Sequence, residues 1–256
     1  YRAGMDGSDV QRVLATGSPW GLAVDTENAK LYWSFGFDKY TGIKRANLDG
    51  SGVETIYNAD SSEPERLAIH SGLGKLYWTS VKGVFRANLD GTNPQFLVPF
   101  SDYCRPWGIA VDPLNAKLYW SAADTNHFCP QGKLQRSNLD GTQVEDLVLL
   151  AYGVVPEVGV VPAHDSLFWS DAQFIRRARL DGSEVVSIVP TGSEFAYLRA
   201  VDPRPVPADL YAVSSFQNCF GAVEVTASGC SIFDSDGDEQ IDLADYQHLL
   251  TTLGGP

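Results

Sequence analysis

Oxygen-bearing side chains recur at short intervals near the C-terminal end of this 256-residue sequence. They stand at positions 1, 3, 5, 7, 9 and 12 of one segment, as Asp234, Asp236, Asp238, Gln240, Asp242 and Asp245. Carboxylates this close together repel one another unless a cation neutralises them, and Ca²⁺ prefers roughly six to eight such oxygens. The spacing therefore predicts a calcium site, in which Gln240 offers its backbone carbonyl and the aspartates offer carboxylates. A solvated acidic tail is the alternative interpretation.

The residues around this loop favour a folded calcium unit. Ile241 stands at position 8 as an apolar plug, and an exit helix is predicted after it from the apolar residues Leu243, Tyr246, Leu250 and Leu253. Glu239 occupies position 6, where glycine normally makes the sharp turn, and Asp245 is shorter than the glutamate often found at position 12. Both departures predict modest calcium affinity.

Upstream of the loop the sequence repeats itself, and these repeats must form the scaffold. An aromatic motif occurs five times, as Leu31-Tyr32-Trp33-Ser34, Leu76-Tyr77-Trp78-Thr79, Leu118-Tyr119-Trp120-Ser121, Leu167-Phe168-Trp169-Ser170 and Leu210-Tyr211-Ala212-Val213. An Asp-Gly pair recurs in step with it, beginning at Asp6, Asp49, Asp90, Asp140 and Asp181. The motif spacings of 45, 42, 49 and 43 residues are typical of repeat arrays and propellers.

Each repeat supplies four short apolar runs, which are 20–24, 30–34, 43–47 and 53–57 in the first full unit. The Asp-Gly pair between the third and fourth runs predicts a tight hairpin, because glycine adopts a positive φ at little cost. We therefore predict an all-β fold, a β-propeller of four-stranded blades over residues 1–229, followed by the calcium loop and helix over residues 230–256. A sandwich would not repeat its motifs in register, and solenoid repeats are usually shorter.

The strings Gly21-Leu22-Ala23-Val24-Asp25, Lys30-Leu31-Tyr32-Trp33 and Arg45-Ala46-Asn47-Leu48-Asp49-Gly50-Ser51 resemble the LDL-receptor class B repeat of the YWTD β-propeller family. The resemblance implies six blades, tied together by the Thr and Asp side chains of the family motif. The segment 234–245 resembles one half of a type I dockerin, the calcium-loop module of secreted bacterial proteins.

The number of blades stays open in the sequence. Tyr1-Arg2-Ala3 matches the third strand of a blade, as in Lys44-Arg45-Ala46, so six blades would require residues upstream of Tyr1. In a five-bladed ring, residues 1–14 would complete the last unit instead. A third possibility is an open blade that another chain fills, because an unpaired strand edge recruits partners.

Alignment of the repeats also predicts a candidate binding surface. The residues that begin the innermost strands should stand at one height around the channel mouth, and they are Trp20, Glu65, Trp107, Glu157 and Tyr197. An aromatic and acidic ring of this kind can hold a Lys or Arg side chain, or a sugar, by cation–π and stacking contacts. The alternative is that these aromatic residues only pack between blades.

The cysteines bear on the cellular compartment. Four are present, Cys104, Cys129, Cys219 and Cys230, and they allow three pairings. Our hypothesis is two local disulfides, one joining Cys104 to Cys129 and one joining Cys219 to Cys230. Disulfides combined with a calcium loop indicate an extracellular, secreted protein, and the dockerin resemblance suggests a bacterial cell surface.

Charge and motif content narrow the functional classes. Lys and Arg total 19 against 32 Asp and Glu, a net charge of −13 that disfavours nucleic acid and anionic membranes, and no apolar run suits membrane insertion. The four histidines show no paired spacing, and no nucleophile elbow or phosphate loop occurs. We predict a non-catalytic module that binds a protein or glycan partner. The alternatives are a structural subunit that assembles with copies of itself, and a propeller hydrolase.

Overall fold

The computed structural model describes residues 1–3, 8–15, 19–37, 40–59, 63–99, 104–123, 131–150, 157–170 and 174–190. These residues form four antiparallel sheets, each made of four consecutive strands. The first contains β1 (Pro19–Asp25), β2 (Lys30–Phe37), β3 (Tyr40–Asn47) and β4 (Glu54–Ala59). The second contains β5 (Pro64–His70), β6 (Lys75–Ser80), β7 (Gly83–Asn88) and β8 (Gln95–Pro99).

The other two sheets repeat this order. The third contains β9 (Arg105–Asp112), β10 (Lys117–Ala123), β11 (Lys133–Asn138) and β12 (Glu145–Leu149). The fourth contains β13 (Val158–Val161), β14 (Ser166–Ser170), β15 (Phe174–Ala178) and β16 (Val186–Pro190). Short 3₁₀ turns, η1 (Ser71–Leu73) and η2 (Pro162–His164), follow β5 and β13.

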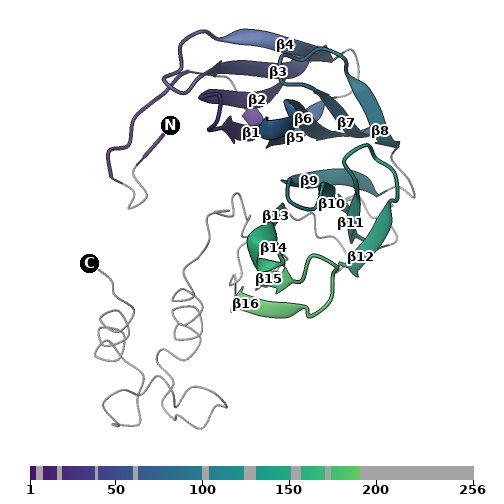
Figure 1. Cartoon of the computed structure of the whole chain (residues 1–256). Helices are drawn as coiled ribbons and strands as arrows, with labels where there is room; N and C mark the ends of the chain where they lie inside the picture. The colour runs from purple at the N-terminus through teal and green to yellow at the C-terminus, as the bar shows by residue number, and fades with distance from the viewer. Residues whose placement is uncertain are drawn as a thin grey trace, which may run out of the picture.

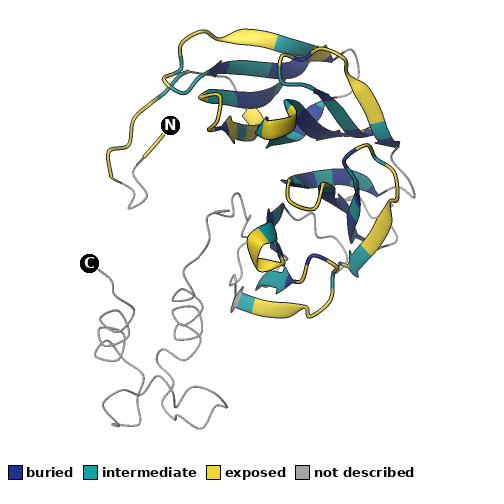
Figure 2. Ribbon diagram, in the orientation of Figure 1, coloured by how far each residue is buried: buried dark blue, intermediate teal, exposed yellow. Residues whose placement is uncertain are grey.

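The four sheets follow one another along an arc, with the first strand of each sheet innermost and the fourth at the periphery (Figure 1). The innermost strands contact one another in succession, β1 with β5, β5 with β9, and β9 with β13. Figure 2 shows that burial is concentrated in the middle strands and in the innermost strands β5, β9 and β13, whereas β1 and the peripheral strands are largely exposed. This arrangement confirms the predicted propeller fold of four-stranded blades.

The hydrophobic core lies between the sheets. Tyr32 and Ile43 of the first sheet pack with Leu67 and Trp78 of the second sheet in one buried cluster. Equivalent clusters join the second sheet to the third and the third to the fourth. Because a single four-stranded sheet cannot cover its own apolar faces, each sheet is stabilised by the neighbour stacked on it.

Hydroxyl groups of the aromatic motif tie successive sheets together. Ser34 Oγ accepts a hydrogen bond from Gly21 N at 2.8 Å within its sheet and donates to Glu65 O at 2.7 Å in the next sheet. Thr79 Oγ1 donates to Trp107 O at 2.6 Å in the same way. Serine at position 34 therefore makes the contact that the resemblance assigns to threonine.

The Asp-Gly turns form the second link between sheets, and they explain why glycine is needed there. Gly91 has a φ of +82°, and a Cβ at this position would lie 1.9 Å from Ile56 O of the preceding sheet. Gly141 has a φ of +83°, and its Cβ would lie 2.8 Å from Leu97 O. Only a residue without a side chain permits this close approach of turn and strand.

Residues 1–3 and 8–15 have the geometry of the outer half of another blade. Arg2 and Gln11 pair in an antiparallel bridge, as Arg45 and Glu54 pair between β3 and β4. A Cβ at Gly50 would lie 2.4 Å from Val13 O, which repeats the relation of Gly91 to Ile56. The N-terminal segment therefore packs on the Gly50 turn of the first sheet as β4 packs on the Gly91 turn of the second.

Several sequence predictions fall outside the described residues. These are the calcium loop at 234–245, the boundary at residue 230, the fifth repeat with Tyr197, and the cysteines Cys129, Cys219 and Cys230. The blade number therefore stays a prediction. Cys104 is buried and takes part in a disulfide bond. Its Sγ lies 3.6 Å from Gln131 O, close in sequence to the predicted partner.

Candidate binding site at the innermost strands

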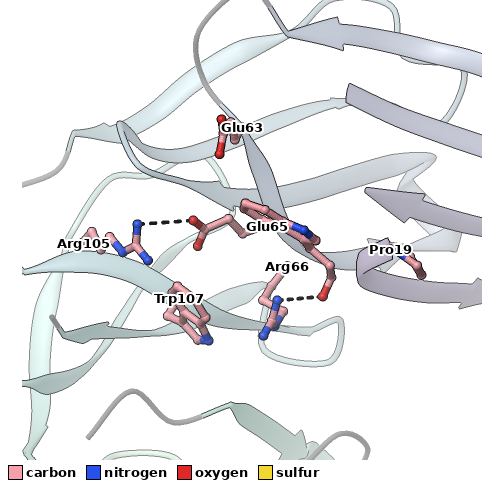
Figure 3. A pocket seen from close by; sticks show the side chains of 7 residues that line it. Pro19, Glu63, Glu65, Arg66, Arg105 and Trp107 are labelled. Atoms are coloured by element: carbon pink, nitrogen blue, oxygen red, sulfur yellow. Dashed lines mark hydrogen bonds and ion pairs between the residues drawn. The ribbon is translucent and has the colours of Figure 1, made fainter. Parts of the chain in front are cut away.

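Three of the five predicted surface residues lie together at the starts of β1, β5 and β9. They line a pocket of about 400 Å³, within the roughly 300–1,000 Å³ usual for ligand sites. We call it the inner-strand pocket, and its lining residues are Pro19, Trp20, Glu63, Glu65, Arg66, Arg105 and Trp107. Figure 3 shows side chains from three different sheets pointing toward one space.

Strand register explains why these positions coincide. Leu22, Leu67 and Ile109 pair with the tryptophans of their own aromatic motifs, and each strand has an irregularity just before this pair. Trp20, Glu65 and Trp107 all stand two residues before those paired positions. A bulge locally re-aims side chains, so the repeated irregularity turns all three toward the same region.

Glu157 does not share this register position, which corrects the sequence alignment. Val158 pairs with Trp169, so Glu157 stands one residue before the paired position and is equivalent to Arg66. Its carboxylate forms an ion pair with the Arg66 guanidinium. Glu157 therefore stays close to the other predicted residues through Arg66, although it does not line the pocket itself.

Arg66 connects the four sheets. Its Nη1 donates to Trp20 O at 2.7 Å in the first sheet, and its Nε donates to Glu157 beside β13 in the fourth. Its guanidinium carbon lies 5.0 Å from the ring centroid of Trp107 in the third sheet. Because Arg66 belongs to β5 of the second sheet, its side chain links that sheet to the first, third and fourth sheets.

The two arginines of the pocket were not found by sequence reasoning. Arg105 lies over the Trp107 ring at 4.7 Å, so the ring already carries two cations of the protein itself. The repeats gave no signal for them, since Arg66 aligns with Gly21 and Gly108. A cation from a partner must therefore find its main acceptor elsewhere than on the Trp107 ring.

Glu65 is the most buried polar group of the pocket, with 1% of its surface exposed. Arg105 Nη1 lies 3.5 Å from its Oε1, while Oε2 has no hydrogen-bond partner in the described part of the chain. Burial raises the pKa of Glu65 to about 7, although the positive charges of Arg105 and Arg66 oppose the rise. The buried Nε1 of Trp107 also lacks a partner among the described residues.

These two groups define what the pocket can do chemically. Glu65 offers an acceptor oxygen and Trp107 offers an N–H donor, both removed from water. A buried polar atom without a partner costs about 1–3 kcal/mol, so a ligand that satisfies either group gains affinity. Within the described ranges, no cluster of three or more His, Cys, Asp or Glu side chains could hold a metal ion, and no helix could cross a membrane.

Comparisons with known proteins agree with the propeller geometry. The low-density lipoprotein receptor-related protein 5-like protein of Homo sapiens is 28% identical over 163 residues, covering 63% of this chain and 59% of that protein. Low-density lipoprotein receptor-related protein 5 of Mus musculus is 31% identical over 159 residues, covering 60% of this chain and 9% of the receptor. The chain thus spans only part of these relatives. No family model matches it.

Solved structures give the same class. A chain in the crystal structure of a nidogen/laminin complex superposes with a TM-score of 0.61 and 25% identity, over 70% of this chain and 66% of that one. A gluconolactonase from Xanthomonas campestris superposes with a TM-score of 0.57 and 15% identity, over 72% of this chain and 67% of that one. The second likeness concerns the fold alone. The protein is a β-propeller similar to those of LDL-receptor-related proteins.

Proposed function

We propose that this protein is a non-catalytic, extracellular binding module that captures a protein partner at the inner-strand pocket. The observation that carries the proposal is the pocket itself, where three sheets contribute aromatic surface and buried polar atoms without partners. Aromatic and arginine side chains around a desolvated centre are typical of the residues that dominate protein interfaces. Trp20 is 38% exposed and provides apolar surface at the pocket rim.

The relatives support a protein partner over other ligands. Two of them are named as receptor-related proteins, and the nidogen structure was solved as a complex with laminin. The enzyme alternative rests on propellers such as the gluconolactonase, whose likeness is one of fold. We therefore favour recognition of a protein over turnover of a small molecule.

The test is selection of binders from a random peptide library displayed on phage, using the full chain as bait. The affinity of each binder is then measured for the unsubstituted chain, for the variant Trp20→Ala and for the control variant Phe96→Ala. Phe96 is a suitable control because it is an exposed aromatic residue on the peripheral strand β8. We expect most binders to lose at least tenfold in affinity with Trp20→Ala and to keep it with Phe96→Ala. Binders that ignore Trp20 would contradict the proposal.

We also propose that the segment 234–245 binds one Ca²⁺ and thereby orders the C-terminal residues. Its support is the spacing of the aspartates, and binding only to the folded state would raise stability. Calcium should raise the melting temperature of the full chain, and Asp234→Asn combined with Asp236→Asn should abolish the rise. Glu184→Gln, at an exposed turn, is the control. An unchanged melting temperature in the unsubstituted chain would refute this calcium site.

Assembly with copies of itself, as in a fibre or surface layer, is the competing proposal. Solution mass with and without calcium separates the two, because a monomer under both conditions is incompatible with head-to-tail assembly.

A further inference from the structure

We propose that the inner-strand pocket takes the ammonium group of a lysine side chain from the partner, with Glu65 Oε2 as its acceptor. This inference rests on the proposed function, because it names the chemical group that the same pocket recognises. Glu65 is the second residue of the innermost strand of the second sheet, which contacts the innermost strands of the first and third sheets, and it lines the pocket.

The Glu65 carboxylate has one oxygen without a partner among the described residues. Its Oε1 has Arg105 Nη1 at 3.5 Å, a long separation for an ion pair, and its Oε2 has no partner in the described ranges. The group is almost completely buried, so water does not solvate this oxygen freely. A donor supplied by a ligand would satisfy an oxygen that the described residues leave unpaired.

The surroundings of Glu65 suit an ammonium group better than a guanidinium group. A guanidinium fork binds a carboxylate best through both oxygens and stacks on a flat ring. In this pocket, one oxygen already faces Arg105, and Arg66 and Arg105 lie over the Trp107 ring. A single free oxygen suits the compact ammonium group of lysine, which donates as a point charge.

The charge around the pocket also favours a cation. Glu65 is faced by Arg105 on β9, by Arg66 on its own strand, by Glu63 just before that strand, and by Glu157 beside β13. Three carboxylates against two guanidinium groups leave the region negative when all are ionised, and the whole chain carries −13. A cationic side chain is therefore favoured over a neutral or anionic one.

Lysine binding in this geometry is coupled to a proton. The ammonium group needs an ionised acceptor, whereas burial raises the pKa of Glu65 to about 7 in the free protein. Binding therefore releases a proton near neutral pH, and the affinity increases as the pH rises through 7. Between pH 6 and pH 8 the ionised fraction of a group with this pKa changes roughly tenfold, and the affinity should follow it.

The experiment uses one peptide from the phage selection whose binding depends on Trp20, synthesised with each lysine replaced in turn by norleucine, arginine or acetyl-lysine. Affinities for the full chain are measured by calorimetry at pH 6 and pH 8. We expect one lysine whose replacement by any of the three costs at least tenfold at pH 8. Calorimetry at pH 7 in two buffers of different ionisation enthalpy should show about half a proton released.

A variant of the protein provides the second arm. Glu65→Gln should lose the affinity difference between lysine and norleucine peptides and the tenfold effect of pH, whereas Glu54→Gln, on the peripheral strand β4, should keep both. The norleucine comparison on the unsubstituted chain keeps the test valid if Glu65→Gln does not fold.

The possible outcomes separate this inference from the proposed function. Pocket-dependent peptides that tolerate loss of every lysine, or that require arginine, would overturn the lysine inference and leave the binding function intact. Peptides that require no residue of the pocket would overturn both.

Discussion

The first sheet has two flanks, one toward the second sheet and one toward the N-terminal segment. The two flanks differ in burial although the neighbouring sheets are built from the same repeat. On the flank toward the second sheet, Tyr32 and Ile43 are buried against Leu67, which is 7% exposed. Leu22 occupies the same register position as Leu67 and Ile109, yet it is 63% exposed, whereas Ile109 is 7% exposed. Burial in this protein is therefore supplied by the neighbouring sheet and not by the sheet that carries the side chain.

The N-terminal segment covers only part of the exposed flank. Val13 approaches Gly50 at the peripheral turn, as Ile56 approaches Gly91, but Leu22 and Val24 on the innermost strand are half or more exposed. Among the described residues, the outer half of a blade is thus in place on this flank while the inner apolar positions remain exposed. The comparison predicts that equal substitutions on the two flanks have unequal effects.

The largest expected effect is the loss of unfolding free energy when a leucine covered by a neighbouring sheet is truncated to alanine. The same truncation at an exposed position is the comparison. Leu67→Ala should lower the free energy of unfolding by about 2–5 kcal/mol, because it leaves a cavity between two sheets. Leu22→Ala, at the equivalent position, should cost less than about 1 kcal/mol because its side chain is mostly exposed. Urea denaturation of both variants checks this, and equal losses would show that the Leu22 flank is covered in solution.

The next largest expected effect is the pH dependence of stability that the buried Glu65 carboxylate produces. Its pKa is raised from 4.5 to about 7, so the folded chain holds a proton here that the unfolded chain has released between these pH values. Stability should therefore be highest at the acid end of this window and fall as the pH rises through 7, by on the order of 2–3 kcal/mol between pH 5 and pH 8.

Glu65→Gln is the matched variant for this measurement, because it keeps the shape of the side chain and removes its titration. Chemical denaturation at pH 5, 6, 7 and 8 should show a smaller pH dependence for the variant than for the unsubstituted chain. An identical dependence in both would mean that another group is responsible.

A smaller effect is expected at the Asp-Gly turns. Gly91→Ala should cost at least about 2 kcal/mol, since it combines left-handed strain with a Cβ 1.9 Å from a backbone oxygen. Gly74 has a φ of +60° but nothing within 4 Å of its Cβ position, so Gly74→Ala should cost only about 1 kcal/mol. Thermal unfolding of the two variants separates the strain from the contact between sheets, and similar losses would argue against that contact.

The smallest effect tests a single hydroxyl between sheets. Thr79→Val removes the bond to Trp107 O and should cost about 1–2 kcal/mol, because the carbonyl loses its donor. Thr79→Ser should stay within about 0.5 kcal/mol, since Ser34 makes the equivalent contact in the first sheet. Loss of stability with serine would show that the methyl group, and not the hydroxyl, stabilises this interface.

The sequence predicted the sheets and part of the pocket because both depend on periodic positions. The aromatic motifs, Leu-Tyr-Trp in three sheets and Leu-Phe-Trp in the fourth, form the second strand of every described sheet. The shared register of the first three sheets places Trp20, Glu65 and Trp107 together. Glu157 was misaligned by one residue, since Val158 pairs with Trp169 and Glu157 stands only one residue before that pair. Motif counting cannot detect such a shift, which only the pairing to the second strand reveals.

The rest of the site depends on residues that do not repeat. Arg66 and Arg105 have no counterparts at their positions in the first sheet, so no alignment of repeats could draw attention to them. The raised pKa of Glu65 is likewise a result of three-dimensional burial and not of local sequence. Repetition thus predicts the scaffold, while individual departures from the repeat give the pocket its chemistry.

The most direct test of recognition at the inner-strand pocket is hydrogen–deuterium exchange of the full chain, measured with and without a bound peptide. The peptide is taken from the phage selection before its binding to any variant has been measured. The account predicts slower exchange at residues 19–21, 63–66 and 105–107, with the peripheral strands β4, β8, β12 and β16 unchanged. Protection confined to those peripheral strands would contradict it.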